Sequence, residues 1–283
     1  MTGDRPLWIL VVGTVATYPG LWLVWCVSTL LGMHGSSRSI ASDRLSQVAA
    51  YLALAVVGAV SVALAVRTLA RVASATHGLV RELESRRIQP PGRLATEATN
   101  LDIARLMVVD RAEEFAFTVG ALRPRVVVSS GMAAALPDAE MRAVLAHEAS
   151  HVRRWDPLRA LAVQVAAAHL WFAPLAKDLR SRAVSEHELA ADRYAVDRCG
   201  RAALASALLR AAPGPGAAEV AVSGFAATGL LEARVRQLES GRVLLPGLRS
   251  VPRSTLSGIA VLGFASAVAA SWSLMIAACP CPM

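Results

Sequence analysis

The chain has 283 residues, of which 55% are hydrophobic, and a formal net charge of +8 at neutral pH. Its mean hydropathy of +0.47 is higher than a soluble domain of this size needs, so we predict a membrane protein. The positive charge comes almost entirely from arginine, and no basic run is interleaved with aromatic residues, which argues against direct nucleic-acid binding.

Three long stretches without a charged residue divide the chain: residues 6–37, 45–66 and 254–283. Each supplies the roughly 20 apolar residues that a membrane-spanning helix needs. The first is too long for a cleaved signal peptide and a second span follows it at once, so we interpret it as an uncleaved span. We therefore predict two transmembrane helices with a short external loop in residues 1–66, and a third with a short external tail in residues 254–283.

The distribution of arginine predicts the orientation of these spans. Only Arg38 and Arg44 lie in the loop between the first two, whereas many arginines flank the region 67–253. Because positive residues near span ends stay on the cytoplasmic side, we expect residues 67–253 to be cytoplasmic. The protein is then a multi-pass protein of the cell membrane, with the lipid bilayer as a partner.

A small sheet is predicted in the first part of this central region. Residues 102–110, 115–120 and 125–130 are rich in Val, Phe and Thr, which is typical of strands. We expect three strands beside the helix that follows. Residues 115–120 or 125–130 could also pair with an extended peptide by strand addition, and an ordinary structural hairpin is the alternative.

The next helix carries the most specific motif of the chain. Pro137 followed by acidic residues predicts its start, and Asp156-Pro157 predicts its end. Within it, His147, Glu148 and His151 form the pattern H-E-x-x-H. Two histidines four residues apart lie on one helical face, so both rings can reach one metal ion. Zn²⁺ is such an ion, and the adjacent glutamate can act as a general base.

An exposed polar helix face is the alternative interpretation of this motif. Apolar residues at helical spacing argue against it, because they predict that the helix is buried: Met141, Val144, Leu145 and Val152. A buried histidine pair needs partners, and a metal ion supplies them.

A catalytic zinc usually has a third protein ligand, and Glu188 is the best candidate. Glu188 and Asp192 belong to the pattern E-x-x-A-D on a second helix and share one face of it. We expect Glu188 to bind the metal and Asp192 to accept the second ring N–H of a ligand histidine. A solvated acidic face is the alternative, and Glu186 and His187 are competing ligands.

Residues 160–176 form a fourth stretch without charge. A single helix of this length would rise about 25 Å, close to the thickness of a membrane. A full crossing would place Glu188 on the opposite side from His151. The metal hypothesis therefore requires that this helix is buried in the protein or dipped into the bilayer. Beyond Asp192 we expect a helix in residues 202–212, a loop that could gate the site up to Gly229, and an amphipathic helix in residues 230–239.

Four segments together resemble a known family: residues 115–120 (FAFTVG), 123–129 (RPRVVVS), 136–157 and 188–192. They are similar to integral-membrane zinc peptidases of the BlaR/MecR type, and more distantly to the HtpX and CAAX-prenyl-protease group. The resemblance covers about residues 70–245. It implies one zinc ion per chain, bound by His147, His151 and Glu188, with Glu148 as the catalytic base.

The resemblance also implies a fold and a function. We expect a mainly α membrane protein, with three transmembrane helices around a zincin-like α+β metallopeptidase domain whose small sheet lies beside the H-E-x-x-H helix. Its function would be that of a membrane-bound zinc metalloendopeptidase that cleaves a protein, with a transcriptional repressor in an envelope or antibiotic response as a candidate substrate. Receptors of this type carry a penicillin-binding domain after their last span. This chain ends near its last predicted span, so we expect no direct β-lactam sensing.

Two other functions remain open at this point. A non-catalytic membrane signalling scaffold could retain the metallopeptidase fold, although the intact Glu148 counts against it. A metal-dependent membrane hydrolase acting on another class of substrate is the third possibility, which only the resemblance separates from a peptidase.

Overall fold

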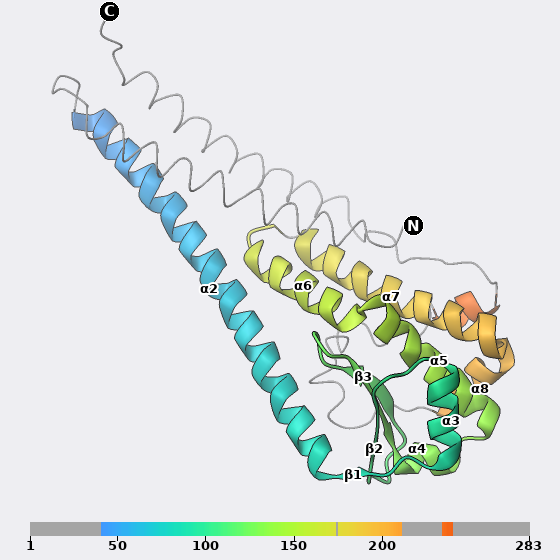
Figure 1. Cartoon of the computed structure of the whole chain (residues 1–283). Coiled ribbons are helices and arrows are strands. Elements are labelled where there is room, and N and C mark those ends of the chain that lie inside the picture. The colour runs from blue at the N-terminus through green and yellow to red at the C-terminus, as the bar shows by residue number, and fades with distance from the viewer. Residues whose placement is uncertain (1–40, 174, 211–233, 240–283) are drawn as a thin grey trace, which may run out of the picture.

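The computed structural model describes residues 41–173, 175–210 and 234–239. The first and third predicted spans and the predicted loop at residues 213–229 lie outside the described residues. The described helices and strands are labelled in Figure 1.

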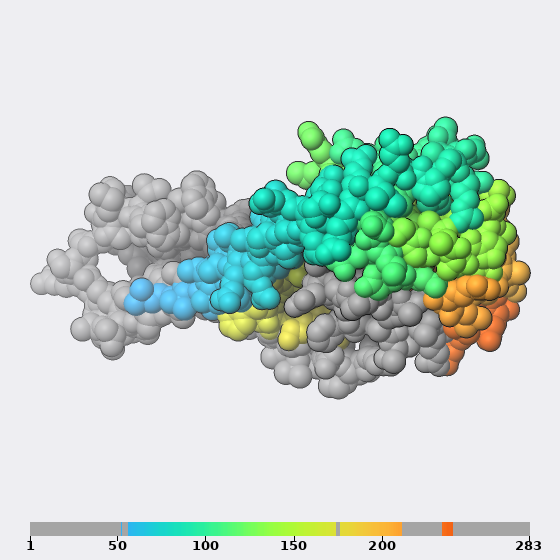
Figure 2. Space-filling model, turned by 90° about the horizontal axis from the view of Figure 1, so that it is seen from below, coloured from blue at the N-terminus to red at the C-terminus, as the bar shows by residue number. Residues whose placement is uncertain are grey.

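A single long helix, α2 (Ala41–Ser85), begins the described chain and extends away from the other elements (Figures 1 and 2). Its 45 residues correspond to about 67 Å, more than twice the thickness of a bilayer core. It contains the second predicted span. The part Val56–Ser85 is the one segment among the described residues that is long and apolar enough to cross a membrane, and it exposes large apolar side chains at Val56, Val66 and Leu69.

A four-stranded sheet follows, one strand more than the sequence predicted. Its strands are β1 (Arg87–Ile88), β2 (Leu106–Val109), β3 (Ala116–Val119) and β4 (Arg125–Ser129), in the order β1-β2-β4-β3. β2 and β4 are parallel, and the other two pairs are antiparallel. β1 has only two residues, too few to give an alternating pattern in the sequence. β3 lies at one edge of the sheet.

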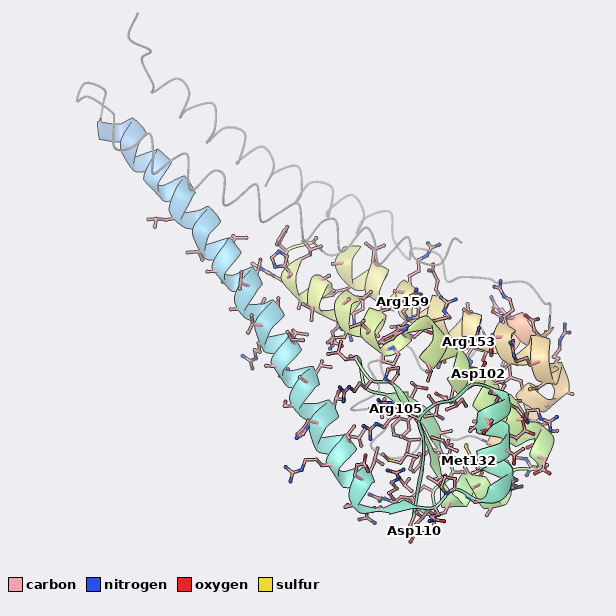
Figure 3. The ribbon with its side chains drawn as sticks, in the orientation of Figure 1. Asp102, Arg105, Asp110, Met132, Arg153 and Arg159 are labelled. Atoms are coloured by element: carbon pink, nitrogen blue, oxygen red, sulfur yellow. The ribbon has the colours of Figure 1, made fainter. Side chains whose placement is uncertain are left out.

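Helix α5 (Asp138–Arg154) packs against the sheet and against α7, with the bounds that the sequence predicted. Pro137 precedes it, acidic residues occupy its first turn, and basic residues occupy its last. It ends at Trp155, which adopts a left-handed backbone conformation with φ +56°. Near this end, Nη1 of Arg153 lies 3.9 Å from Oδ2 of Asp102 (Figure 3).

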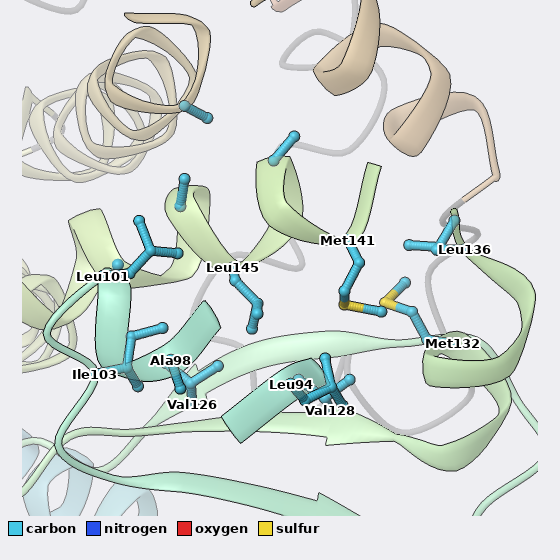
Figure 4. Close-up of a cluster of buried hydrophobic side chains, with 14 of the residues drawn as sticks. Leu94, Ala98, Leu101, Ile103, Val126, Val128, Met132, Leu136, Met141 and Leu145 are labelled. Carbon is cyan, nitrogen blue, oxygen red and sulfur yellow. The ribbon is translucent and has the colours of Figure 1, made fainter. Parts of the chain in front are cut away.

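The main core lies between α5 and one face of the sheet. Two short helices, α3 (Gly92–Asn100) and α4 (Ser130–Ala135), close this layer. Figure 4 shows the side chains that fill it, which include Leu94, Val126, Val128, Met132, Met141 and Leu145. The opposite face of the sheet packs against the end of α2 through Leu83, Met107 and Val127. This packing fixes α5 relative to the strands, and with it the H-E-x-x-H motif.

The remaining helices are α6 (Asp156–His169), α7 (Leu175–Cys199) and α8 (Arg201–Arg210). The prediction of one unbroken helix over residues 160–176 is wrong, because the chain turns back between α6 and α7. The turn follows from the local sequence, since Pro174 cannot continue a helix. α6 packs against α2 and α7 packs against α5, so the hairpin carries the chain away from α5 and returns it (Figure 1).

Candidate metal centre

Three donor side chains from two helices converge on one point. His147 and His151 project from α5, one turn apart, and Glu188 projects from α7, which packs against α5. One ligand atom from each lies within 4.8 Å of the other two. The Nε2 atoms of the two histidines are 3.2 Å apart. The two carboxylate oxygens of Glu188 lie 3.5 Å from Nε2 of His147 and 3.5 Å from Nε2 of His151.

These distances fit a single bound metal ion. Ligand atoms placed 2.0–2.1 Å from a tetrahedral zinc ion are separated by about 3.3–3.4 Å from one another. The Nε2 atoms of His147 and His151 also face each other. Two Nε2 lone pairs at this distance repel each other, and a cation between them removes the repulsion. Two imidazoles and one carboxylate are the ligand set of a common class of catalytic zinc site, in which three protein ligands leave a fourth position for water or substrate.

Each histidine is oriented by a buried carboxylate on its far side. Nδ1 of His147 lies 2.9 Å from Oδ1 of Asp192, as the sequence predicted, and the side chain of Asp192 is fully buried. Nδ1 of His151 lies 2.9 Å from Oδ2 of Asp156, whose side chain is also buried. Such carboxylates hold a ligand ring with its Nε2 lone pair directed at the metal. The sequence indicated Asp156 only as part of the helix end.

The ionisable groups of the site shift each other's pKa strongly. Burial alone would lower the pKa of His147, but the Asp192 and Glu188 carboxylates raise it to about 10. Burial likewise opposes the charge on His151, whose pKa is nevertheless raised by Glu188 and by the hydrogen bond to Asp156. Burial would raise the pKa of Glu188, but the two histidines lower it. A metal ion binds the neutral imidazole, so a divalent cation that binds here competes with protons for the histidine rings.

Glu148 stands next to this cluster and outside it. It is buried, and its Oε2 accepts a hydrogen bond of 2.6 Å from the hydroxyl group of Thr118. Thr118 lies on the edge strand β3, so the edge of the sheet and the carboxylate of Glu148 are in direct contact. The carboxylate is therefore held in one orientation by a neighbour that the sequence did not indicate.

The two competing ligands have other partners. Oε1 of Glu186 accepts a hydrogen bond of 3.1 Å from Arg182 on the same helix. Nε2 of His187 lies 4.0 Å from Oδ1 of Asp156. Among the described residues, the one group of three metal-binding side chains is His147, His151 and Glu188.

Comparison with known families shows which family has this sequence pattern. The family model described as BlaR1 peptidase M56 matches residues 28–238, well over half of the chain. The chain belongs to the BlaR1 peptidase M56 family. No curated protein sequence matches the chain at a comparable level.

Membership of the M56 family makes the chain a peptidase of a membrane-associated family. The His-His-Glu cluster and the apolar helix α2 are compatible with both properties. The resemblance to the BlaR/MecR type is therefore confirmed. The more distant similarity to the HtpX and CAAX-prenyl-protease group stays a prediction.

Arg234 is a site residue that the sequence did not reveal. It lies in the described helical segment 234–239, where its Nε and Nη2 atoms each donate a hydrogen bond of 2.7 Å to the two oxygens of Asp192. Its Nη1 lies 3.5 Å from Oε2 of Glu188. The buried Asp192 predicts a cationic partner, but arginine is so common in this chain that the sequence does not indicate which one. The cationic groups near the motif have other contacts, since Arg182 pairs with Glu186 and Arg198 lies 3.7 Å above the ring of Tyr194.

We expect Arg234→Ala to weaken zinc binding by about 10–100-fold, because Asp192 loses the partner that holds it against His147. Arg234→Lys should restore part of this affinity, since lysine keeps the charge and loses the paired hydrogen bonds. Arg236→Ala, at an exposed position on the same segment, is the matched control. Competition titration with a chromophoric chelator measures the affinity of each purified protein. Equal zinc affinity of Arg234→Ala and Arg236→Ala would contradict the role of Arg234.

Proposed function

We propose that this M56 protein is a membrane-bound zinc metalloendopeptidase that hydrolyses peptide bonds of a protein substrate. The observation that carries the proposal is the convergence of His147, His151 and Glu188 at 3.2–3.5 Å, with Glu148 beside them. This donor set suits Zn²⁺, one ion per chain, better than the harder cations, which prefer oxygen ligands.

The side chains have separate roles in this proposal. His147, His151 and Glu188 would hold the zinc ion, which would supply Lewis acidity to the scissile carbonyl group and its water molecule. Glu148 accepts a proton from the attacking water molecule and transfers it to the departing amine. The hydroxyl group of Thr118 keeps the carboxylate of Glu148 turned toward the reacting groups through its 2.6 Å hydrogen bond. Asp192 and Asp156 hold the two histidines in the tautomer that binds metal.

The edge strand supports a peptide substrate. β4 is paired with β2 on one side and with β3 on the other, so residues 125–129 have no open edge. β3 pairs only with β4 among the described strands, and Thr118 on β3 contacts Glu148. An extended substrate segment that pairs with β3 through its backbone would therefore lie alongside the catalytic carboxylate. A substrate without an amide backbone could not form the hydrogen bonds of strand pairing with β3.

The cellular setting is part of the proposal. We infer three transmembrane helices, a cytoplasmic domain at residues 67–253 and the lipid bilayer as a partner, supported by the uncharged stretches and the arginines that flank them. A transcriptional repressor of an envelope or antibiotic response is the candidate substrate, supported by the resemblance to BlaR/MecR-type peptidases. No direct nucleic-acid binding is expected.

The proposal is tested with full-length protein in lipid nanodiscs, loaded with one equivalent of zinc and incubated with a peptide library from a digested bacterial proteome. Mass spectrometry should find new peptide termini that disappear with 1,10-phenanthroline and return when zinc is added back. A zinc-loaded protein that cleaves no peptide in the library would favour the non-catalytic scaffold. Cleavage that continues in the presence of the chelator would contradict a metallopeptidase.

A further inference from the structure

The turn between α6 and α7, described at residues 170–173, carries two aromatic side chains at the end of the helical hairpin. Trp171 is 46% exposed, and its ring meets that of Phe172 edge-on, with centroids 6.2 Å apart. Exposure alone does not mark a contact surface, since Trp155 is 47% exposed as well. Trp171 differs because it lies at the tip of an uncharged hairpin beside a second aromatic ring.

This turn is attached to the candidate membrane span. Nε1 of Trp171 donates a hydrogen bond of 3.2 Å to Oγ of Ser61, which is almost fully buried although it lies on α2. α6 packs along α2, and the space-filling view shows the yellow part of the chain, around the junction of α6 and α7, against the blue part of α2 (Figure 2). The position of Ser61 on α2 therefore gives the depth of the turn.

That depth lies inside the uncharged stretch. Ser61 precedes Arg67, the first charged residue after residues 45–66, by six positions. At 1.5 Å per residue this places Ser61 about 9 Å from Arg67 along the helix, on the apolar side. Half of a bilayer core is about 15 Å thick, and the roughly 9 Å along the helix is an upper limit on depth because spanning helices tilt. The turn therefore enters the acyl chains of the cytoplasmic leaflet and stops short of the bilayer centre. An indole ring inside the acyl chains needs a partner for its N–H, and the hydroxyl group of Ser61 supplies it.

The charges on the two arms of the hairpin agree with this depth. The uncharged stretch 160–176 is bounded by Arg159 on α6 and by Lys177 on α7. Lys177 is exposed close to the turn and can extend its ammonium group toward the headgroups. Arg159 lies about 15 Å from the end of α6 at His169, with its Nη1 4.0 Å from Oδ1 of Asp156.

We propose that the turn between α6 and α7 is inserted into the cytoplasmic leaflet of the bilayer, with Trp171 and Phe172 among its acyl chains and short of the bilayer centre. The partner of this surface is the lipid itself. The inference rests on the membrane-bound form of the proposed function and does not depend on catalysis.

Insertion of the turn sets the height of the metal centre above the membrane. α6 runs from Asp156, which contacts His151, to His169 next to the turn, a rise of about 20 Å. α7 returns over a similar length to Glu188. Two rigid arms of equal length therefore place both halves of the metal site at one fixed distance from the lipid surface. The uncharged stretch enters the membrane without crossing it, so Glu188 and His151 stay on the same side.

The test compares two tryptophans of equal exposure at opposite ends of α6. Trp171 is 46% exposed and Trp155 is 47% exposed. Two full-length proteins are prepared, each keeping one of these residues and carrying phenylalanine at the other five tryptophan positions. Both are placed in nanodiscs of phosphatidylcholine brominated either near the headgroup end or near the methyl end of its acyl chains, since bromine quenches indole fluorescence on contact.

We expect shallow bromine to quench Trp171 by roughly half and deep bromine to quench it less, because the indole lies in the cytoplasmic leaflet and stops short of the bilayer centre. Trp155 should keep its fluorescence in both lipids. Equal fluorescence of Trp171 in brominated and ordinary lipid would mean that protein covers the turn, and would overturn the proposal. Stronger quenching by deep bromine would also overturn it, because the stretch would then reach the bilayer centre.

A second measurement needs only one substitution. The quenching of the otherwise native protein minus that of Trp171→Phe gives the signal of Trp171 alone, and Trp155→Phe gives that of Trp155. The zinc content and peptide hydrolysis of the same nanodiscs are measured in parallel. Quenching of Trp171 without zinc binding would contradict the proposed function and support insertion of the turn. Zinc binding without quenching would support the proposed metal site and contradict insertion.

Discussion

Replacing Glu148 with glutamine should abolish peptide hydrolysis and leave about one zinc ion bound per chain. Glu148 lies outside the His147, His151 and Glu188 cluster and is hydrogen-bonded to Thr118, so we expect it to move a proton and not to bind the metal. Loss of a general base lowers the rate by about 10²–10⁴-fold. The amide keeps the size of the side chain, so the buried surroundings of position 148 should not change.

The matched control is Glu113→Gln, at a half-exposed position outside the site. It should retain both zinc and activity. The rate of hydrolysis of one identified peptide and the zinc content by atomic emission are measured on the same preparations. If Glu148→Gln lost its zinc as well, Glu148 would be a ligand and its role as base would be wrong.

Replacing Glu188 with alanine should remove the metal and the activity together. Glu188 supplies the only carboxylate within 3.5 Å of both Nε2 atoms among the described residues. Its removal leaves two histidines and the buried cation Arg234 beside them, so we expect zinc affinity to fall by more than about 100-fold, beyond the effect of losing an orienting partner such as Asp192.

Glu186→Ala is the control for this substitution. Glu186 is two residues away on the same helix and pairs with Arg182, so its loss should leave zinc affinity unchanged. Equilibrium dialysis against buffered zinc, with the helix content of each protein measured by circular dichroism, separates loss of the ligand from loss of the fold. Full zinc occupancy in Glu188→Ala, or loss of zinc in Glu186→Ala, would contradict the assignment of Glu188 as the third ligand.

The local part of the site follows from the sequence because it depends on helix geometry alone. Residues four positions apart share a helical face, which is enough to place His147 beside His151 and Glu188 near Asp192. The pairing of these two helices was predicted from the need of a zinc ion for a third ligand, and the structure brings the residues together. Their roles as ligands stay predictions until metal binding is measured.

The partners that come from tertiary contacts could not be predicted. Thr118 reaches Glu148 because the edge strand packs beside α5, and Arg234 reaches Asp192 from a segment 42 residues further along the chain. Nothing in the local sequence around either residue distinguishes it from other threonines or arginines. Asp156 illustrates a different limit, since a residue that ends one helix is also the hydrogen-bond partner of His151.

The stretch 160–176 shows why hydropathy alone gave the wrong helix. A window average registers an uncharged segment but not the point at which its backbone turns. Pro174 indicated that point, yet a proline also occurs inside kinked membrane helices. Only the requirement that Glu188 and His151 share a metal excluded a full crossing, and the structure satisfies that requirement with a turn between α6 and α7.

Zinc content measured side by side on three full-length proteins tests the proposed metallopeptidase site most directly. The wild type, Glu148→Gln and Glu188→Ala are purified in the same nanodiscs, stripped with a chelator, reloaded with zinc and washed. We predict about one zinc ion per chain for the wild type, the same for Glu148→Gln, and almost none for Glu188→Ala. A wild-type protein that retains no zinc, or a Glu188→Ala protein that retains as much as the wild type, would contradict a zinc site built from His147, His151 and Glu188.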